Sequence, residues 1–159
     1  MEVLLIRHGE ASWDAKSDME RCLTQRGEEQ AAAAGQWLRE QDWLPDQIWV
    51  SAYRRAQQTA AILSEGWTGR RRIIASLTPD TPPAELETLL ETFRGERLLL
   101  VGHNPLFSNL VGHWHAGKPE SYWGLQPASM ALLTGDVFAA GTADLQYLRH
   151  FPNYDHNGR

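Results

Sequence analysis

Residues 1–9, MEVLLIRHG, join a short apolar run to three residues that can carry chemistry. The run 3–6 is continuous rather than alternating, which is typical of a strand buried on both faces of a parallel sheet. Arg7, His8 and Gly9 follow it directly. Ligands of open α/β sheets bind at the carboxyl ends of the strands. A cation, an imidazole and a residue without Cβ are therefore expected together at a binding site.

The composition is that of one ordinary globular domain. The chain has 159 residues, of which 42% are hydrophobic and 22% charged, and its formal net charge is −5. This acidic balance disfavours nonspecific binding to nucleic acid. The single cysteine, Cys22, excludes an intramolecular disulfide and a zinc site built on cysteines. The sequence has no signal-peptide pattern, and no apolar stretch approaches the length of about 20 residues that a membrane span needs. We therefore expect a soluble, cytoplasmic protein that binds no membrane.

Strand and helix patterns alternate along the chain. Expected strands cover 3–7, 48–51, 73–75 and 98–101, and expected helices cover 25–41, 53–64, 82–93 and a segment after residue 105. Two late strands, at 130–133 and 145–151, are expected to form a hairpin. The alternation predicts an α/β fold, a three-layer α/β/α sandwich with a largely parallel central sheet, in one domain over residues 1–159. The polar stretch 152–159 is expected to be a loose tail.

Polar side chains follow three of the expected strands. Arg7 and His8 follow the first, Arg55 follows the second and His103 follows the fourth. In a parallel sheet these strand ends share one edge, so two histidines and at least two arginines converge. Arginine donates paired hydrogen bonds to phosphate and keeps its charge at any working pH. Because a neutral imidazole can attack phosphorus, the cluster predicts phosphoryl chemistry that needs no metal or other cofactor.

Four segments in this order resemble the histidine phosphatase (phosphoglycerate-mutase-like) superfamily. They are RHGE at 7–10, LT at 23–24 with Gly27, SAYRRAQQT at 51–59, and GH at 102–103. Their order, their spacing and the short chain length are most similar to the SixA-type phosphohistidine phosphatases, a small bacterial branch. The resemblance extends to about residue 115. It implies the phosphoglycerate-mutase-like version of the α/β/α sandwich.

The resemblance also implies roles for the matching residues. His8 would take the phosphoryl group and pass it to water, with its other ring nitrogen held by a backbone carbonyl. Arg7 and Arg55 would bind the phosphoryl oxygens, and His103 would donate a hydrogen bond to the pentavalent state. Three further residues are expected around the bound substrate: Gly9, Arg21 and Ser51.

Several neighbouring residues keep a second interpretation. Ser51 is also a possible cap for the second helix, and Arg54 is expected on that helix's surface rather than in the site. His113 and His115 are spaced to point apart, which disfavours a metal pair. The rim of the cleft has three aromatic candidates: Trp13, Tyr122 and Trp123.

The chain departs from the larger ester-cleaving relatives, which carry a glutamate as general acid after the third strand. Here the stretch 76–80 is SLTPD, and the nearest acids are Asp80 and Glu85. A phosphohistidine P–N bond needs such an acid less, because imidazole leaves readily. The short stretch between Arg55 and His103 leaves little room for a lid, and an open site suits a protein substrate.

The sequence therefore predicts a metal-independent phosphatase that removes the phosphoryl group from phosphohistidine on a partner protein, such as a phosphotransfer domain. Two alternatives remain at this point. One is a phosphatase of small phosphorylated molecules, which would use the same nucleophile. The other is a noncatalytic module that binds phosphate, although the presence of both histidines disfavours it.

Overall fold

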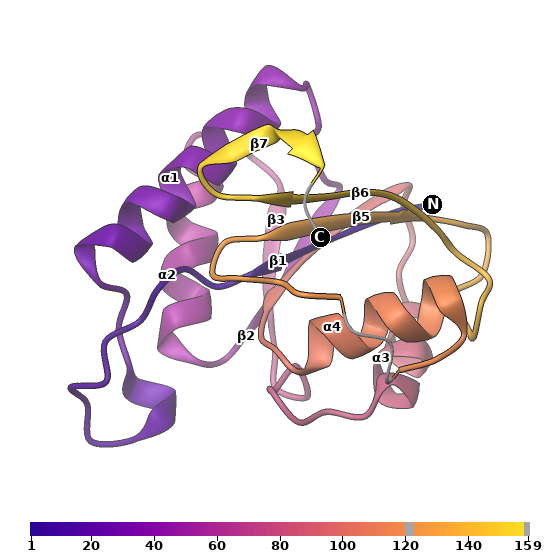
Figure 1. The fold of residues 1–159 in the computed structure, drawn as a ribbon, viewed down its shortest axis with the longest axis horizontal. Helices are drawn as coiled ribbons and strands as arrows, with labels where there is room; N and C mark the ends of the chain where they lie inside the picture. Colours follow the sequence, from indigo (N-terminus) through magenta and orange to yellow (C-terminus); the bar gives the residue numbers. More distant parts are fainter. Residues whose placement is uncertain (120–122, 158–159) are drawn as a thin grey trace.

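A mixed seven-stranded sheet divides two layers of helices in the computed structural model, which describes residues 1–119 and 123–157 (Figure 1). The strands are β1 (Glu2–Arg7), β2 (Gln47–Ser51), β3 (Arg70–Ile74), β4 (Arg97–Gly102), β5 (Met130–Thr134), β6 (Asp144–His150) and β7 (Asn153–Asn157). Their order is β3-β2-β4-β1-β5-β6-β7. The half from β3 to β1 is parallel, whereas β5, β6 and β7 extend it antiparallel.

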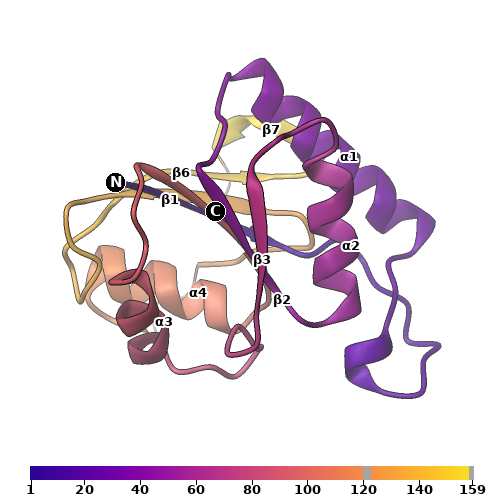
Figure 2. The same cartoon turned by 180° about the vertical axis from the view of Figure 1, so that it is seen from behind.

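Helices cover both faces of this sheet, as the two opposite views show (Figures 1 and 2). The first face carries α1 (Gln25–Glu40) and α2 (Arg54–Leu63), and the second carries α3 (Pro83–Leu90) and α4 (Leu106–Val111). A π-helical turn, η2 (Gly112–Ala116), continues α4. The predicted three-layer α/β/α sandwich is confirmed. Among the described residues, no helix is both long and apolar enough to cross a membrane.

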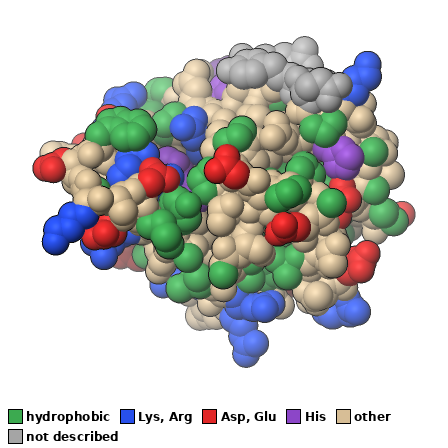
Figure 3. Space-filling model, turned by 90° about the horizontal axis from the view of Figure 1, so that it is seen from below, with side chains coloured by type: hydrophobic (Ala, Val, Ile, Leu, Met, Phe, Trp, Pro, Cys, Tyr) green, Lys and Arg blue, Asp and Glu red, His purple; other side chains and the backbone are tan. Residues whose placement is uncertain are grey.

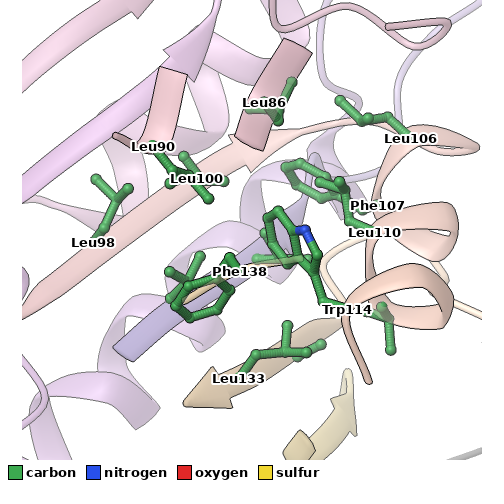
Figure 4. Packing of buried hydrophobic residues seen from close by; sticks show 14 of the residues in the cluster. Leu86, Leu90, Leu98, Leu100, Leu106, Phe107, Leu110, Trp114, Leu133 and Phe138 are labelled. Carbon is green, nitrogen blue, oxygen red and sulfur yellow. The ribbon is translucent and has the colours of Figure 1, made fainter. Parts of the chain in front are cut away.

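The central strands are continuous apolar runs because both of their faces are buried. In β1, Val3 and Leu5 face one hydrophobic cluster while Leu4 and Ile6 face the other, and all four are fully buried. β4 repeats this pattern beside it, with Glu2 to Arg7 of β1 in register with Arg97 to Gly102. The second face is filled by large side chains from α4 and η2, including Phe107, Leu110 and Trp114 (Figure 4).

The edges of the sheet differ from the expectation. The edge strand β3 begins at Arg70 rather than at residue 73 and so includes three arginines, because an edge strand can extend charged side chains into water. The predicted loose tail is wrong for residues 153–157, which pair with β6 as β7. Tyr154 anchors that strand: it is buried, and its hydroxyl donates to Ala128 O at 2.8 Å. Residues 158–159 lie outside the described part of the chain.

Helices α1 and α2 approach each other closely at Gly35. A Cβ on Gly35 would lie 2.4 Å from the carbonyl oxygen of Leu63 and 2.8 Å from its Cα. Both are backbone atoms, which cannot move without shifting the end of α2. The absence of a side chain at residue 35 therefore sets the distance between the two helices on this face.

We predict that Gly35→Ala destabilises the fold. Alanine in a helix interior normally stabilises by about 1 kcal/mol relative to glycine. Here the collision with Leu63 should reverse the sign and lower the free energy of unfolding by about 1–3 kcal/mol. Urea denaturation measures the difference. Gln36→Ala, at the exposed neighbouring position, is the control and should change stability by less than about 0.5 kcal/mol. A Gly35→Ala protein as stable as wild type would contradict the close approach.

Candidate active site

The carboxyl ends of β1, β2 and β4 bring the predicted residues together. β4 lies between the other two strands, and Arg7 at the end of β1 is in register with Gly102 at the end of β4. His8 and His103 follow these two positions, and their ring centroids are 5.2 Å apart. Arg55 enters from the first turn of α2, which follows β2 after a short turn. The convergence expected from the sequence is thus present.

His8 is held in one tautomer by its neighbour. Its Nδ1 lies 2.7 Å from Gly9 O, and because a carbonyl oxygen can only accept, Nδ1 carries the hydrogen. The Nε2 atom is then left with a lone pair, which accepts a hydrogen bond from Arg55 Nε at 3.2 Å. His8 is buried apart from 7% of its surface. A neutral imidazole with an oriented lone pair is the form that can act as a nucleophile.

Arg55 is fixed on several sides. Its Nη1 donates to Asp18 O at 2.6 Å, and its Nη2 lies 3.3 Å from Asp18 Oδ2. Its guanidinium carbon is 4.9 Å from the centre of the Tyr53 ring. Thr59 connects this helical turn to the segment that follows β1, because its hydroxyl donates to Arg55 O and accepts from Gly9 N–H. The guanidinium is therefore oriented before any substrate binds.

Asp18 belongs to the short 3₁₀ turn η1 (Asp18–Glu20) in the loop between β1 and α1. Partial burial raises the pKa of its carboxyl, but hydrogen bonds from Arg21 and Arg55 outweigh this effect and hold the pKa below the ordinary value. The carboxylate stays charged and bridges the two arginines. From the sequence, Asp18 is either a carboxylate that orients a neighbouring arginine or a solvated loop acid, and the structure pairs it with Arg21 and also with Arg55.

Arg7 is oriented by a segment far away in the sequence. Its Nη1 donates to Leu125 O at 2.8 Å, and Asn104 Nδ2 donates to the same oxygen at 2.9 Å. Ala128 N–H donates to the carbonyl oxygens of both Arg7 and His8. Residues 125–129 thus brace the end of β1. No sequence signal marks Leu125, because its contribution is a backbone oxygen.

Arg21 lies at the edge of the cluster. Its Nε and Nη2 donate to the carbonyl oxygens of Ser12 and Ala11, at 2.9 and 3.2 Å, and its Nη1 contacts Asp18. The Trp13 ring stacks on its guanidinium at 3.5 Å. These contacts hold the loop around the site. A direct contact between Arg21 and a phosphoryl group stays a prediction.

His103 is enclosed more completely than His8. It is 1% exposed, its Nε2 lies 2.7 Å from Ser51 Oγ, and the Tyr53 ring packs against it with a centroid distance of 4.7 Å. Ser51 does not cap α2, whose N-cap residue is Tyr53 without a side-chain cap bond. Instead, Ser51 Oγ accepts from Tyr53 N–H at 3.1 Å.

Both imidazoles are neutral at ordinary pH. Burial lowers the pKa of His8 to about 3, although its bond to Gly9 opposes the shift, and the charges of Arg55, Arg7 and Arg21 lower it further. Burial also lowers the pKa of His103 to about 3, assisted by His8 and Arg55. The positive charge of the site is therefore carried by its arginines, while the histidines remain available as a nucleophile and a neutral hydrogen-bond donor.

The remaining candidates lie elsewhere or have other partners. The Trp123 ring packs against His115, Trp13 is 83% exposed on the loop beside the site, and Tyr122 lies outside the described residues. His113 contacts Glu87 at 2.8 Å. Asp80, Glu85 and Arg54 are exposed. Within residues 1–119 and 123–157, no three or more His, Cys, Asp or Glu side chains are grouped to hold a metal ion.

Comparison with known proteins identifies the family. A model of the histidine phosphatase superfamily, branch 1, matches residues 3–77. A phosphohistidine phosphatase SixA homolog from Haemophilus influenzae is 32% identical over 150 residues, which cover 86% of this chain and 89% of that protein. The chain belongs to the SixA branch of the histidine phosphatase superfamily.

Two further comparisons agree with this assignment. Phosphohistidine phosphatase SixA from Escherichia coli is 27% identical over 151 residues, which cover 92% of each chain. The solved structure of the protein histidine phosphatase SixA complexed with tungstate has a TM-score of 0.80 and 27% identity, and covers 93% of this chain and 96% of its own. These matches reach well beyond residue 115, so this SixA-type chain resembles the branch over almost its full length.

We predict that Arg55→Ala and Arg54→Ala have very different effects in this SixA-type chain. The two arginines are adjacent on α2, but Arg55 is 3% exposed and contacts His8, whereas Arg54 is exposed. Loss of Arg55 should lower kcat/KM for p-nitrophenyl phosphate by at least about 100-fold. Loss of Arg54 should change it by less than about threefold. Equal effects would mean that Arg55 is not the group that meets the phosphoryl oxygens.

We also predict that neither active-site imidazole gains a proton between pH 8 and 5. With both pKa values near 3, the folded protein protonates these rings only in strong acid, whereas an unperturbed histidine titrates near pH 6.5. The unfolded chain binds these protons first, so the free energy of unfolding should fall as the pH drops from about 6.5 towards 3. Imidazole NMR titration, assigned with His8→Ala and His103→Ala, checks the values. A midpoint near pH 6.5 for either ring would refute them.

Proposed function

We propose that this SixA-type chain removes the phosphoryl group from phosphohistidine on a partner protein, through a covalent intermediate on His8 and without a metal or cofactor. The observation that carries the proposal is the tautomer of His8. Gly9 O holds the hydrogen on Nδ1, so the lone pair of Nε2 faces Arg55 in the cluster of cations. The names of two relatives as phosphohistidine phosphatases support the choice of substrate.

The first half of the reaction exchanges one P–N bond for another. His8 Nε2 attacks phosphorus, a bond forms between them, and the bond to the substrate imidazole breaks. Its electron pair stays on the leaving nitrogen, and the substrate imidazole departs neutral when its other nitrogen carries a proton. Arg55, which donates to His8 Nε2, and Arg7, whose charge also acts on His8, would neutralise charge on the phosphoryl oxygens. Because nucleophile and leaving group are both imidazoles, this half needs no strong general acid.

The second half regenerates the enzyme. Water attacks the phosphorus bound to His8 Nε2, the P–N bond breaks, and its electron pair returns to Nε2. Inorganic phosphate leaves with the oxygen of the water, whose protons pass to phosphate and solvent. The hydrogen bond to Gly9 O keeps the hydrogen on Nδ1 throughout, so His8 returns to the same neutral form in which it attacked.

The rim of the site suits a protein better than a small molecule. Trp13 is 83% exposed and Met19 49% exposed, on the same loop that carries Asp18 and Arg21. The face in Figure 3 shows hydrophobic side chains exposed among charged ones of both signs. From the end of α2 to the start of β4, the chain forms only β3, α3 and their connections, without a covering subdomain. Exposed large apolar side chains beside an uncovered site favour contact with a partner surface.

The test compares two substrates. The first is a peptide phosphorylated on histidine and the second is p-nitrophenyl phosphate, each assayed with wild type, His8→Ala and His156→Ala in the presence of EDTA. We expect the peptide to be hydrolysed with at least about tenfold higher kcat/KM, because its leaving group needs no acid. His8→Ala should abolish turnover of both, and the exposed His156→Ala should not.

Each part of the proposal has a result that contradicts it. Preference for p-nitrophenyl phosphate would move the function to small phosphate esters, with the same nucleophile. Full activity of His8→Ala would exclude the covalent intermediate. A large loss in EDTA would show that a metal takes part. Binding of the phosphopeptide by wild type without any turnover would identify a noncatalytic phosphate-binding module.

A further inference from the structure

Ser51 has a hydroxyl group in a setting where its single hydrogen can be placed. The residue is completely buried at the end of β2. Its Oγ accepts a hydrogen bond from Tyr53 N–H at 3.1 Å, and it lies 2.7 Å from His103 Nε2. The Tyr53 bond uses one lone pair of Oγ and leaves the hydroxyl hydrogen free. The structure shows no other partner for this hydroxyl within the described residues.

Two arrangements of the Ser51–His103 bond are conceivable, and they differ in their unpaired groups. If His103 Nε2 carried the hydrogen, Ser51 Oγ would accept twice and its own buried hydrogen would have no acceptor among the described residues. If Ser51 donates to Nε2, both of these atoms are satisfied. The first arrangement would leave two buried groups unpaired, the Ser51 hydroxyl hydrogen and the lone pair of His103 Nδ1, whereas the second leaves only the hydrogen on Nδ1 unpaired, so the second is preferred.

This arrangement places the imidazole hydrogen of His103 on Nδ1. That atom is buried, and no hydrogen-bond partner for it is present in the described part of the chain. A buried donor that has no partner forms an especially favourable hydrogen bond when a reacting group brings an acceptor next to it. The ring of His8 is the neighbouring imidazole, 5.2 Å away between centroids, and a phosphoryl group attached to it would bring three acceptor oxygens into this region.

We propose that Ser51 is a positioning residue that fixes His103 as an Nδ1–H donor for the phosphoryl group. The proposal rests on the proposed function, in which His8 carries that group. The two histidines then have different hydrogen-bond partners and opposite roles. His8 gives its Nδ1 hydrogen to Gly9 O and presents the Nε2 lone pair, whereas His103 accepts at Nε2 from Ser51 and presents the Nδ1 hydrogen.

The assignment replaces the expected contact between Ser51 and substrate. A side chain with no exposed surface, whose oxygen is already shared between Tyr53 N–H and His103, is poorly placed to bind a phosphoryl oxygen itself. Its effect passes through the ring of His103. Partners that orient metal-bound histidines commonly affect activity by about 10–100-fold when they are removed, and we expect an effect of this size for Ser51.

Amide side chains test which nitrogen of His103 is the donor. The NH₂ group of asparagine can take the position of Nδ1, and that of glutamine the position of Nε2. His103→Asn should therefore retain at least about tenfold higher kcat for p-nitrophenyl phosphate than His103→Gln. A ratio of one, or a more active His103→Gln, would overturn the assignment of Nδ1. Far-ultraviolet circular dichroism and thermal unfolding of the two proteins verify that both are folded.

A pair of variants with one shape tests the hydroxyl of Ser51. Threonine and valine have nearly the same volume, so Ser51→Thr and Ser51→Val add the same bulk to the buried site. Only the threonine variant keeps a hydroxyl group. Ser51→Val should lower kcat by about 10–100-fold relative to Ser51→Thr, with KM changed by less than about threefold. Equal kcat values in the two variants would exclude a role for the hydroxyl.

Nitrogen-15 NMR of the imidazole groups gives a readout that does not depend on turnover. In the free protein at pH 7, His103 should show a protonated Nδ1 and an imine-type Nε2, and Ser51→Val should show a mixture of both tautomers. A protonated Nε2 in wild type would overturn the proposal even if the enzyme hydrolyses phosphohistidine. The expected tautomer in a protein that lacks phosphatase activity would instead leave the proton assignment in place and refute the proposed function.

Discussion

The hydrogen bond from His8 Nδ1 to Gly9 O is the constraint on which the site depends. It makes Nε2 an acceptor, and only then can Arg55 Nε donate to that atom at 3.2 Å. The backbone at Gly9 is closely packed in turn, because a Cβ on Gly9 would lie 2.6 Å from Gly27 O in the first turn of α1. Residue 9 is therefore glycine because the backbone after β1 packs against the start of a helix, and this same backbone supplies the carbonyl that fixes the tautomer of His8, the proposed nucleophile.

A group of cations surrounds two imidazoles that carry no charge. Burial and, to a smaller extent, the neighbouring arginines lower the pKa of both His8 and His103, so each ring is neutral well below neutral pH. A dianionic phosphoryl group then meets the fixed charges of the arginines instead of a histidine that would have to lose its proton before it could attack. Although the chain has a net charge of −5, Arg7, Arg21 and Arg55 bring positive charge to His8, and Asp18 offsets part of it.

The sequence predicted the parts of the site that depend on side-chain identity and strand order. The apolar runs before Arg7 and before His103 can be recognised in the sequence because both faces of β1 and β4 are buried. The residues that follow these strands could be placed together because parallel neighbouring strands end at the same edge of the sheet. Contacts made by the backbone were not predictable: Leu125 O, which orients Arg7, could belong to any residue. The strand β7 was missed because its composition is polar, and its place depends on buried Tyr154 and on pairing with β6.

The chemistry of the leaving group decides between the candidate substrates. An alkoxide leaving group needs a proton as its bond to phosphorus breaks, and the acids that the sequence offered for this role, Asp80 and Glu85, are both exposed. Asp18 is the carboxylate that reaches the cluster, but two arginines hold its pKa low, so it has no proton to give. An imidazole leaving group removes this requirement, because the bond that breaks and the bond that forms at His8 are of the same kind. A site built from neutral histidines and fixed arginines therefore suits phosphohistidine, because this substrate does not require a general acid.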